Sequence, residues 1–91
     1  MFVVDVKVDI NKAKEEQMKA HLDYCHQEFE KGNIVMCGPS VTYQARGIIV
    51  FKAKSPEDLQ EMLLRDPLYD AASYDVHEFH ASAIAQNIKD Y

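Results

Sequence analysis

The chain has 91 residues, of which 47% are hydrophobic, and it carries a formal net charge of −5. We expect one domain over residues 1–91, with a core over 2–81 and a tail over 82–91 that fits a short helix or an extended arm. The acidic balance argues against nucleic acid or an anionic membrane as partner. No run approaches the roughly 20 apolar residues of a membrane span, and the N-terminus lacks a secretion signal, so a cytoplasmic protein is expected.

The two cysteines, Cys25 and Cys37, lie twelve positions apart without a C-x-x-C pattern. One would lie on a helix and the other on a strand, and both have apolar neighbours. Two reduced core thiols are therefore favoured over a disulfide, and the cytoplasm is the natural compartment for them.

Strand and helix patterns alternate along the first third of the chain. Residues 2–9 are rich in valine and have an apolar residue at every second position, which predicts a strand. Residues 12–31 predict a helix, with Asn11 as its N-cap and Gly32 as its left-handed stop. The apolar stripe of this helix is expected to face the core, and it consists of Met18, Leu22, Cys25 and Phe29.

Two further strands are predicted over 33–38 and 46–53. Both are apolar at consecutive positions, whereas antiparallel strands with one solvated face should alternate. The chain has too few elements to cover both faces of these strands, so a second subunit is expected to cover one of them. The pattern therefore predicts a homodimer.

A second helix is predicted to start with Ser55 as N-cap and Pro56 at its first position, and to close at Asp66-Pro67. Residues 74–81 alternate and predict the last strand. The resulting order is β-α-β-β-α-β. This is the ferredoxin-like α+β fold, a four-stranded antiparallel sheet with two helices on one face.

Three landmarks occur in order along the chain: His21 on the first helix before an apolar strand that ends at Gly38-Pro39, the strand 47–50 before the Ser-Pro-Glu helix start, and Asp66-Pro67 before the last strand. Over roughly residues 2–80, their order and spacing resemble those of the YciI-like (YCII-related) family of small dimeric α+β-barrel proteins.

The resemblance implies a dimer whose two sheets pack face to face, and a pocket between helices and sheet. It also implies a histidine and an aspartate suspected of acid–base chemistry, which fall on His21 and Asp66, and a Gly-Pro turn, which falls on Gly38 and Pro39. The family includes a dehydrochlorinase of chlorinated hydroxyquinol breakdown and is similar in architecture to muconolactone isomerases. This chain departs from it in a short turn over 40–45 and in lacking a Pro-Phe-like close after the last strand, so the pocket shape is expected to differ.

Each candidate site residue also has a purely structural interpretation. His21 lies at the edge of the expected core, which suits a general base, and a histidine that only packs suits the position as well. Asp66 suits a carboxylate that orients the imidazole, or a turn aspartate that bonds its own backbone before Pro67. Four tyrosines are candidates to line the pocket, with Tyr24 and Tyr69 favoured, or are half-buried packing residues: Tyr24, Tyr43, Tyr69 and Tyr74.

A metal site and a cofactor are not expected. His21 and Cys25 are spaced i, i+4, as two metal ligands could be, but the sequence offers no third ligand with tetrahedral spacing. No phosphate loop, nucleophile elbow or dinucleotide fingerprint occurs.

The sequence therefore predicts an enzyme of lyase or isomerase type that acts on a small carbonyl or ring-derived compound through His21 and Asp66. The alternative is a non-catalytic small-molecule binding or assembly module that uses the same dimer pocket. An enzyme should keep the polar pair inside a concave pocket, whereas an assembly module should fill that volume with side chains.

Overall fold

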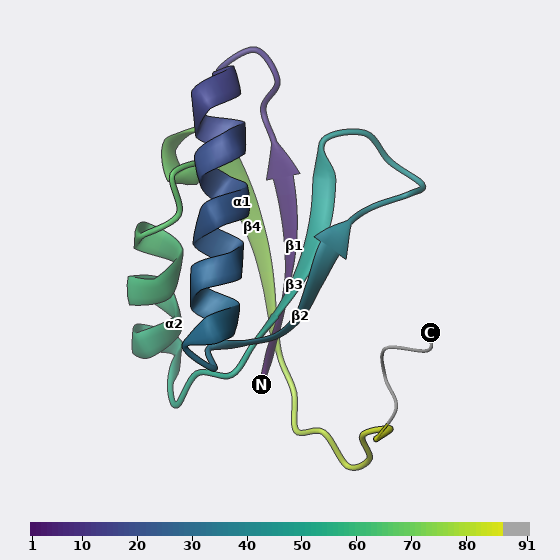
Figure 1. Cartoon of the computed structure of the whole chain (residues 1–91). Helices are drawn as coiled ribbons and strands as arrows, with labels where there is room; N and C mark the ends of the chain where they lie inside the picture. The colour runs from purple at the N-terminus through teal and green to yellow at the C-terminus, as the bar shows by residue number, and fades with distance from the viewer. Residues whose placement is uncertain (87–91) are drawn as a thin grey trace.

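A computed structural model gives the fold and describes residues 1–86. The elements in chain order are β1 (Phe2–Val8), α1 (Glu15–Glu30), β2 (Ile34–Pro39), β3 (Arg46–Phe51), α2 (Pro56–Leu64), a 3-10 turn (Tyr69–Ala71) and β4 (Ala72–Glu78). The strands form an antiparallel sheet in the order β2-β3-β1-β4, and α1 and α2 lie side by side on one of its faces (Figure 1). The predicted ferredoxin-like α+β fold is confirmed. Neither helix is long and apolar enough to cross a membrane, within the part of the chain that the structure describes.

The hydrophobic core lies between the sheet and the helices. Along β1, the side chains of Phe2, Val4 and Val6 point toward the helices and are at most 3% exposed. Residues paired across an antiparallel ladder share a face, so the partners of these residues on β3 enter the same core. The buried residues of β3 and α2 that complete it are Ile49, Phe51, Leu59 and Leu63.

The other face of the sheet carries no helix (Figure 1). Val3, Val50 and Met36 share this face, because Val50 is the register partner of both others. Met36 is 41% exposed, and Ile48, which pairs with Asp5 on the same face, is 40% exposed. The consecutive apolar residues of β2 and β3 therefore divide between a face that the helices cover and one that is open.

The start of α1 differs from the prediction. The helix begins at Glu15 with Lys14 as N-cap, rather than at residue 12 with Asn11 as N-cap. The reason is local: the Asp9 carboxylate accepts the backbone N–H of Asn11 at 3.0 Å, which closes a separate turn before the helix. At the other end, Gly32 has a φ of 84° and forms the predicted left-handed stop.

The buried face of α1 also differs from the predicted stripe. Met18, Leu22 and Phe29 are 40%, 68% and 49% exposed, and Cys25 alone of the four is buried. The helix is turned so that Tyr24, Cys25 and Glu28 face inward. A tyrosine and a glutamate can be buried here because both find hydrogen-bond partners, and hydrophobic periodicity does not detect such a face.

Glu28 shows how this burial is made possible. It is 1% exposed, and its carboxylate accepts hydrogen bonds from Arg65 Nε at 2.8 Å and from Asn33 Nδ2 at 2.7 Å. Burial alone would raise the pKa of Glu28, but the hydrogen bonds from Asn33 and Arg65, together with the Arg65 charge, outweigh it and hold the pKa below its usual value. The pair ties the end of α1 to the end of α2.

Replacing Arg65 by methionine should lower the free energy of unfolding at neutral pH by about 1–3 kcal/mol, because the buried carboxylate loses its charged donor. Since the folded-state pKa of Glu28 is depressed, its contribution is complete above the unfolded pKa of about 4.3 and is lost as pH falls through the folded value. Urea unfolding at neutral and acidic pH measures both effects, with Lys19→Met on the exposed side of α1 as the matched control. If Arg65→Met and Lys19→Met lowered the free energy of unfolding equally, the stabilising role of the Arg65–Glu28 pair would be refuted.

Candidate active site

The site is organised by the Asp66 carboxylate, which lies just after α2 and whose side chain is fully buried. Asp66 Oδ1 lies 2.7 Å from His21 Nδ1 and accepts the backbone N–H of Leu68 at 3.0 Å. Its Oδ2 accepts the Tyr74 hydroxyl at 2.7 Å. Asp66 therefore accepts a hydrogen bond from the backbone of its own turn and also pairs with the imidazole of His21.

The charge of this group follows from its surroundings. Burial by itself would raise the pKa of Asp66, but the hydrogen bonds from His21, Leu68 and Tyr74 outweigh it and hold the pKa below its usual value. Burial first, and then the nearby carboxylate, raises the pKa of the Tyr74 hydroxyl well above its ordinary value, so it stays protonated as a donor. An ionised carboxylate only accepts hydrogen bonds, so Nδ1 of His21 is the nitrogen that donates to Asp66, and Nε2 is the nitrogen left for other partners.

His21 comes from the middle of α1, and its side chain is 15% exposed. The free nitrogen, Nε2, lies 3.5 Å from the sulfur of Cys25, one helical turn further on. Burial, followed by the neighbouring Cys37, raises the pKa of Cys25 to about 12, so its thiol is protonated and is a weak donor toward Nε2. Both cysteines are free, but Cys37 is exposed, which corrects the prediction that it lies in the core.

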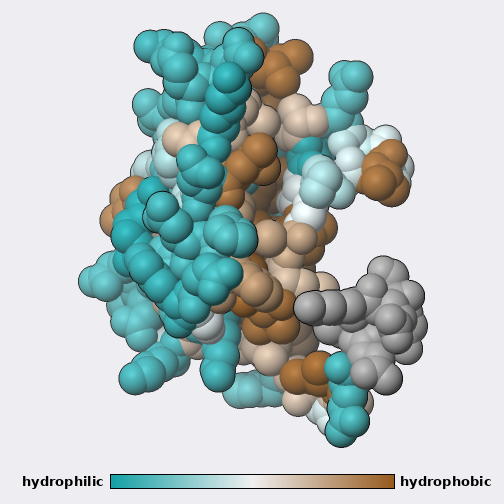
Figure 2. Space-filling model, viewed as in Figure 1, coloured by the Kyte–Doolittle hydropathy of each residue, from teal (hydrophilic) through white to brown (hydrophobic). Residues whose placement is uncertain are grey.

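The ring of His21 borders a cavity of about 450 Å³ between α1 and the β2–β3 hairpin. Gly38 and Pro39 lie on its border, and the short turn 40–45 forms one wall. Figure 2 shows the apolar surface along the side of α1 that faces the strands. The lining is mainly apolar and includes Val6, Met18, Leu22, Val41, Tyr43 and Leu68.

The favoured tyrosines lie outside this cavity, contrary to the prediction. Tyr24 is buried between the helices, where its hydroxyl donates to the backbone carbonyl of Met62 at 2.6 Å. Tyr69 lies at the surface, stacked on Tyr74, and accepts a hydrogen bond from Gln60. Both tyrosines therefore belong to the structure around the site, and neither lines the cavity.

Tyr74 is the site residue whose role the sequence did not reveal. It occupies a position on β4 opposite Val6 of β1, and it therefore points to the helix-covered face. The alternation of the last strand could have placed it there, but its bond to Asp66 depends on how the turn after α2 returns to the sheet. That path cannot be read from periodicity.

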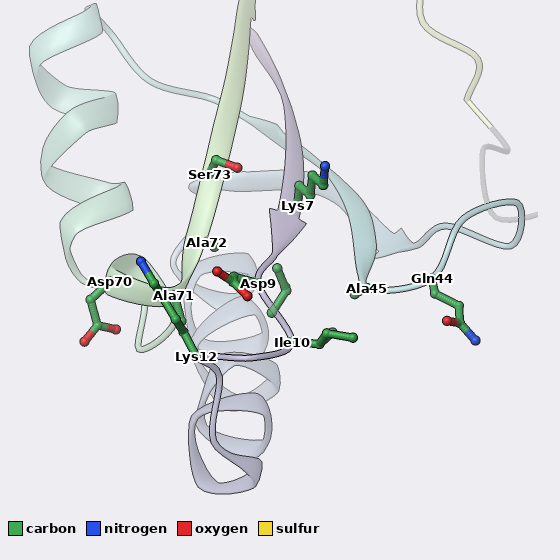
Figure 3. A pocket seen from close by; sticks show the side chains of 11 residues that line it. Lys7, Asp9, Ile10, Lys12, Gln44, Ala45, Asp70, Ala71, Ala72 and Ser73 are labelled. Carbon is green, nitrogen blue, oxygen red and sulfur yellow. The ribbon is translucent and has the colours of Figure 1, made fainter.

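A second hollow of about 630 Å³ lies where β1 ends (Figure 3). Its charged side chains come from the end of β1, the following loop and the 3-10 turn, and all are exposed: Lys7, Asp9, Lys12 and Asp70. Exposed charges of this kind are screened by the surrounding water and salt. The cavity beside His21 is therefore the better candidate for acid–base chemistry.

Fold and site together define a ferredoxin-like α+β protein in which a histidine, paired with a buried aspartate, lies beside a small-molecule-sized cavity. The model of the YCII-related domain matches residues 1–80, and the chain belongs to that family.

One solved structure with a similar fold is 5-chloro-2-hydroxyhydroquinone dehydrochlorinase (TftG) from Burkholderia phenoliruptrix AC1100, in complex with 2,5-dihydroxybenzoquinone. The two chains share 16% sequence identity and superpose with a TM-score of 0.66, over 88% of this chain and 94% of the other. At this identity the likeness establishes the fold alone. A search of curated proteins found no match.

Replacing Tyr74 by phenylalanine should lower the free energy of unfolding at neutral pH by about 1.5–3 kcal/mol, because a hydrogen bond to an ionised carboxylate is lost. The folded-state pKa of Asp66 is depressed, so the deficit is complete above the unfolded pKa of about 3.9 and shrinks as pH falls through the folded value. The control is Tyr69→Phe, which removes the hydroxyl of the stacked neighbour at the surface and should cost less than about 0.5 kcal/mol. Urea titrations measure both variants. If Tyr74→Phe and Tyr69→Phe lowered the free energy of unfolding by the same amount at every pH, the role of Tyr74 would be refuted.

Proposed function

We propose that the protein is an enzyme of lyase or isomerase type that moves a proton on a small, ring-derived carbonyl or enol compound. The observation that carries this proposal is the orientation of His21: its Nδ1 lies 2.7 Å from the buried Asp66, and the ring borders an apolar cavity. A base held in this way presents Nε2 to a bound compound. The cavity is not filled by side chains, which favours a ligand site over a pure assembly module.

The chemistry follows from the two ring nitrogens. Nε2 takes a proton from a carbon next to the carbonyl, and the Asp66 carboxylate stabilises the positive charge that develops on the ring. If a leaving group such as chloride occupies the adjacent carbon, it departs with its bonding electrons and a double bond forms. If the adjacent carbon carries no leaving group, the proton returns at another carbon and the compound is isomerised. Cys25 must give up its contact with Nε2 when the compound binds.

The expected ligand class rests on the shape and lining of the cavity. A volume of about 450 Å³ lies within the range of roughly 300–1,000 Å³ that holds small ligands. The dehydrochlorinase with the same fold was solved with a dihydroxybenzoquinone, a single-ring compound that suits this volume. The turn 40–45, which forms one cavity wall, is the part expected to give this chain its own substrate preference.

The test is a screen of single-ring chlorinated hydroxyquinols, muconolactones and related enols for turnover and for exchange of carbon-bound hydrogen with deuterated water. His21→Ala should slow the reaction by about 10²–10⁴-fold, the range of a lost general base. His26→Ala is the matched control, since it removes an exposed histidine from the same helix and should leave the rate unchanged. A compound that raises the melting temperature of the wild type and of His21→Ala equally, without turnover or exchange, would instead establish a binding module.

We also propose that the protein works as a homodimer, joined through the open face of the sheet. Val3, Met36 and Val50 form an apolar cluster on that face, which the helices do not cover. Two copies packed there would bury the consecutive apolar residues of β2 and β3 on both sides. A stable interface of this kind buries more than about 1,200 Å² in total.

Light scattering at micromolar concentration should give the mass of a dimer, and Met36→Glu should give a monomer because a charge then enters the apolar cluster. Leu64→Glu, a similar change at an exposed leucine of α2 on the opposite side of the sheet, should remain dimeric. A wild-type monomer, or a dimer that survives Met36→Glu, would contradict the proposed interface.

A further inference from the structure

Two cysteines line the same cavity, Cys25 from α1 and Cys37 from β2. In the sheet register Cys37 pairs with the buried Ile49, which puts it on the face that the helices cover. Cα atoms of α1 and β2 approach within 8 Å of each other, and Cys37 is a near enough neighbour to contribute to the raised pKa of the Cys25 thiol. A disulfide needs Cα atoms about 4.4–6.8 Å apart, so α1 and β2 must bring the two cysteines to this separation for the bond to form.

The two cysteines have different surroundings, and the difference assigns them different roles. Cys37 is exposed and can meet an oxidant dissolved in water. Cys25 is 9% exposed and lies 3.5 Å from Nε2 of His21, a nitrogen that can accept its proton. This arrangement is that of an attacking thiol at the surface with a resolving thiol beneath it.

We propose that Cys25 and Cys37 form an oxidation site, in which hydrogen peroxide converts the two thiols into a disulfide beside His21. The Cys37 thiolate attacks one peroxide oxygen, so an S–O bond forms, the O–O bond breaks and hydroxide leaves to become water. The Cys25 sulfur then attacks the sulfenic sulfur of Cys37, the S–O bond breaks, and a second water leaves. Two thiols are oxidised, one peroxide is reduced to two waters, and His21 Nε2 relays the proton from Cys25 to the departing hydroxide.

The disulfide would join α1 to β2 across the cavity. It would also remove the Cys25 thiol that faces Nε2 of His21 in the reduced protein. The oxidation site shares the cavity with the proposed enzymatic function but does not depend on it. Oxidation is measured on the protein itself and needs no substrate. A failure here leaves the deuterium-exchange test of His21 unaffected, and a failure of that test leaves this site intact.

The experiment exposes the native protein to hydrogen peroxide and follows free thiols, intact mass and migration on a non-reducing gel. The wild type should lose both thiols, lose the mass of two hydrogen atoms, remain a single chain on the gel, and recover fully in dithiothreitol. Cys25→Ser should stop at the sulfenic acid of Cys37, which dimedone traps. Cys37→Ser should keep its thiol, because the buried Cys25 does not meet peroxide first.

Three results would overturn the proposal. One is a wild type that keeps both thiols while glutathione in the same tube is oxidised. Another is a disulfide between chains rather than within one chain. The last is a Cys37→Ser variant that loses its thiol as fast as the wild type loses its first thiol, since Cys25 would then react without Cys37.

Discussion

The buried carboxylate of Asp66 is the constraint on which the site depends. A charge without water must be satisfied by donors, and three parts of the chain supply them: α1 through His21, the turn after α2 through the N–H of Leu68, and β4 through Tyr74. These contacts join α1, the turn after α2 and β4 around one carboxylate. They also fix which nitrogen of His21 faces the cavity, so the same interaction that joins helix to sheet sets the chemistry.

The contact between the two helices extends this arrangement along α1 as a polar seam. Successive inward residues of α1, spaced four, three and four apart, each bond to α2 or to the segment that follows it. The four are Gln17, His21, Tyr24 and Glu28. Because every one has a defined partner, the rotation of α1 about its axis is specified by hydrogen bonds rather than by an apolar stripe alone. This leaves Met18 and Leu22 free to line the cavity.

The sequence was sufficient for the fold and for much of the site. Strand alternation, the Ser55-Pro56 helix start and Gly32 are local signals, and the structure agrees with them. The inward face of α1 was not predictable, because hydrophobic periodicity assigns Glu28 to solvent unless the Arg65 that neutralises it is known to lie across the interface. The role of Tyr74 was hidden for the same reason, since its hydroxyl meets Asp66 only after the chain has folded. Local patterns find apolar faces, whereas satisfied polar faces depend on tertiary pairing.

The proposed chemistry requires Asp66 to hold His21 with its proton on Nδ1 and its lone pair on Nε2, facing the cavity. Heteronuclear NMR of the imidazole nitrogens, recorded near pH 8.5 and above the ordinary titration range of histidine, reads the tautomer directly. We expect His21 to carry its proton on Nδ1 in the wild type and to lose this preference in Asp66→Asn, while the exposed His26 is the same in both. A proton on Nε2 of His21 in the wild type, or a tautomer unaffected by Asp66→Asn, would contradict it.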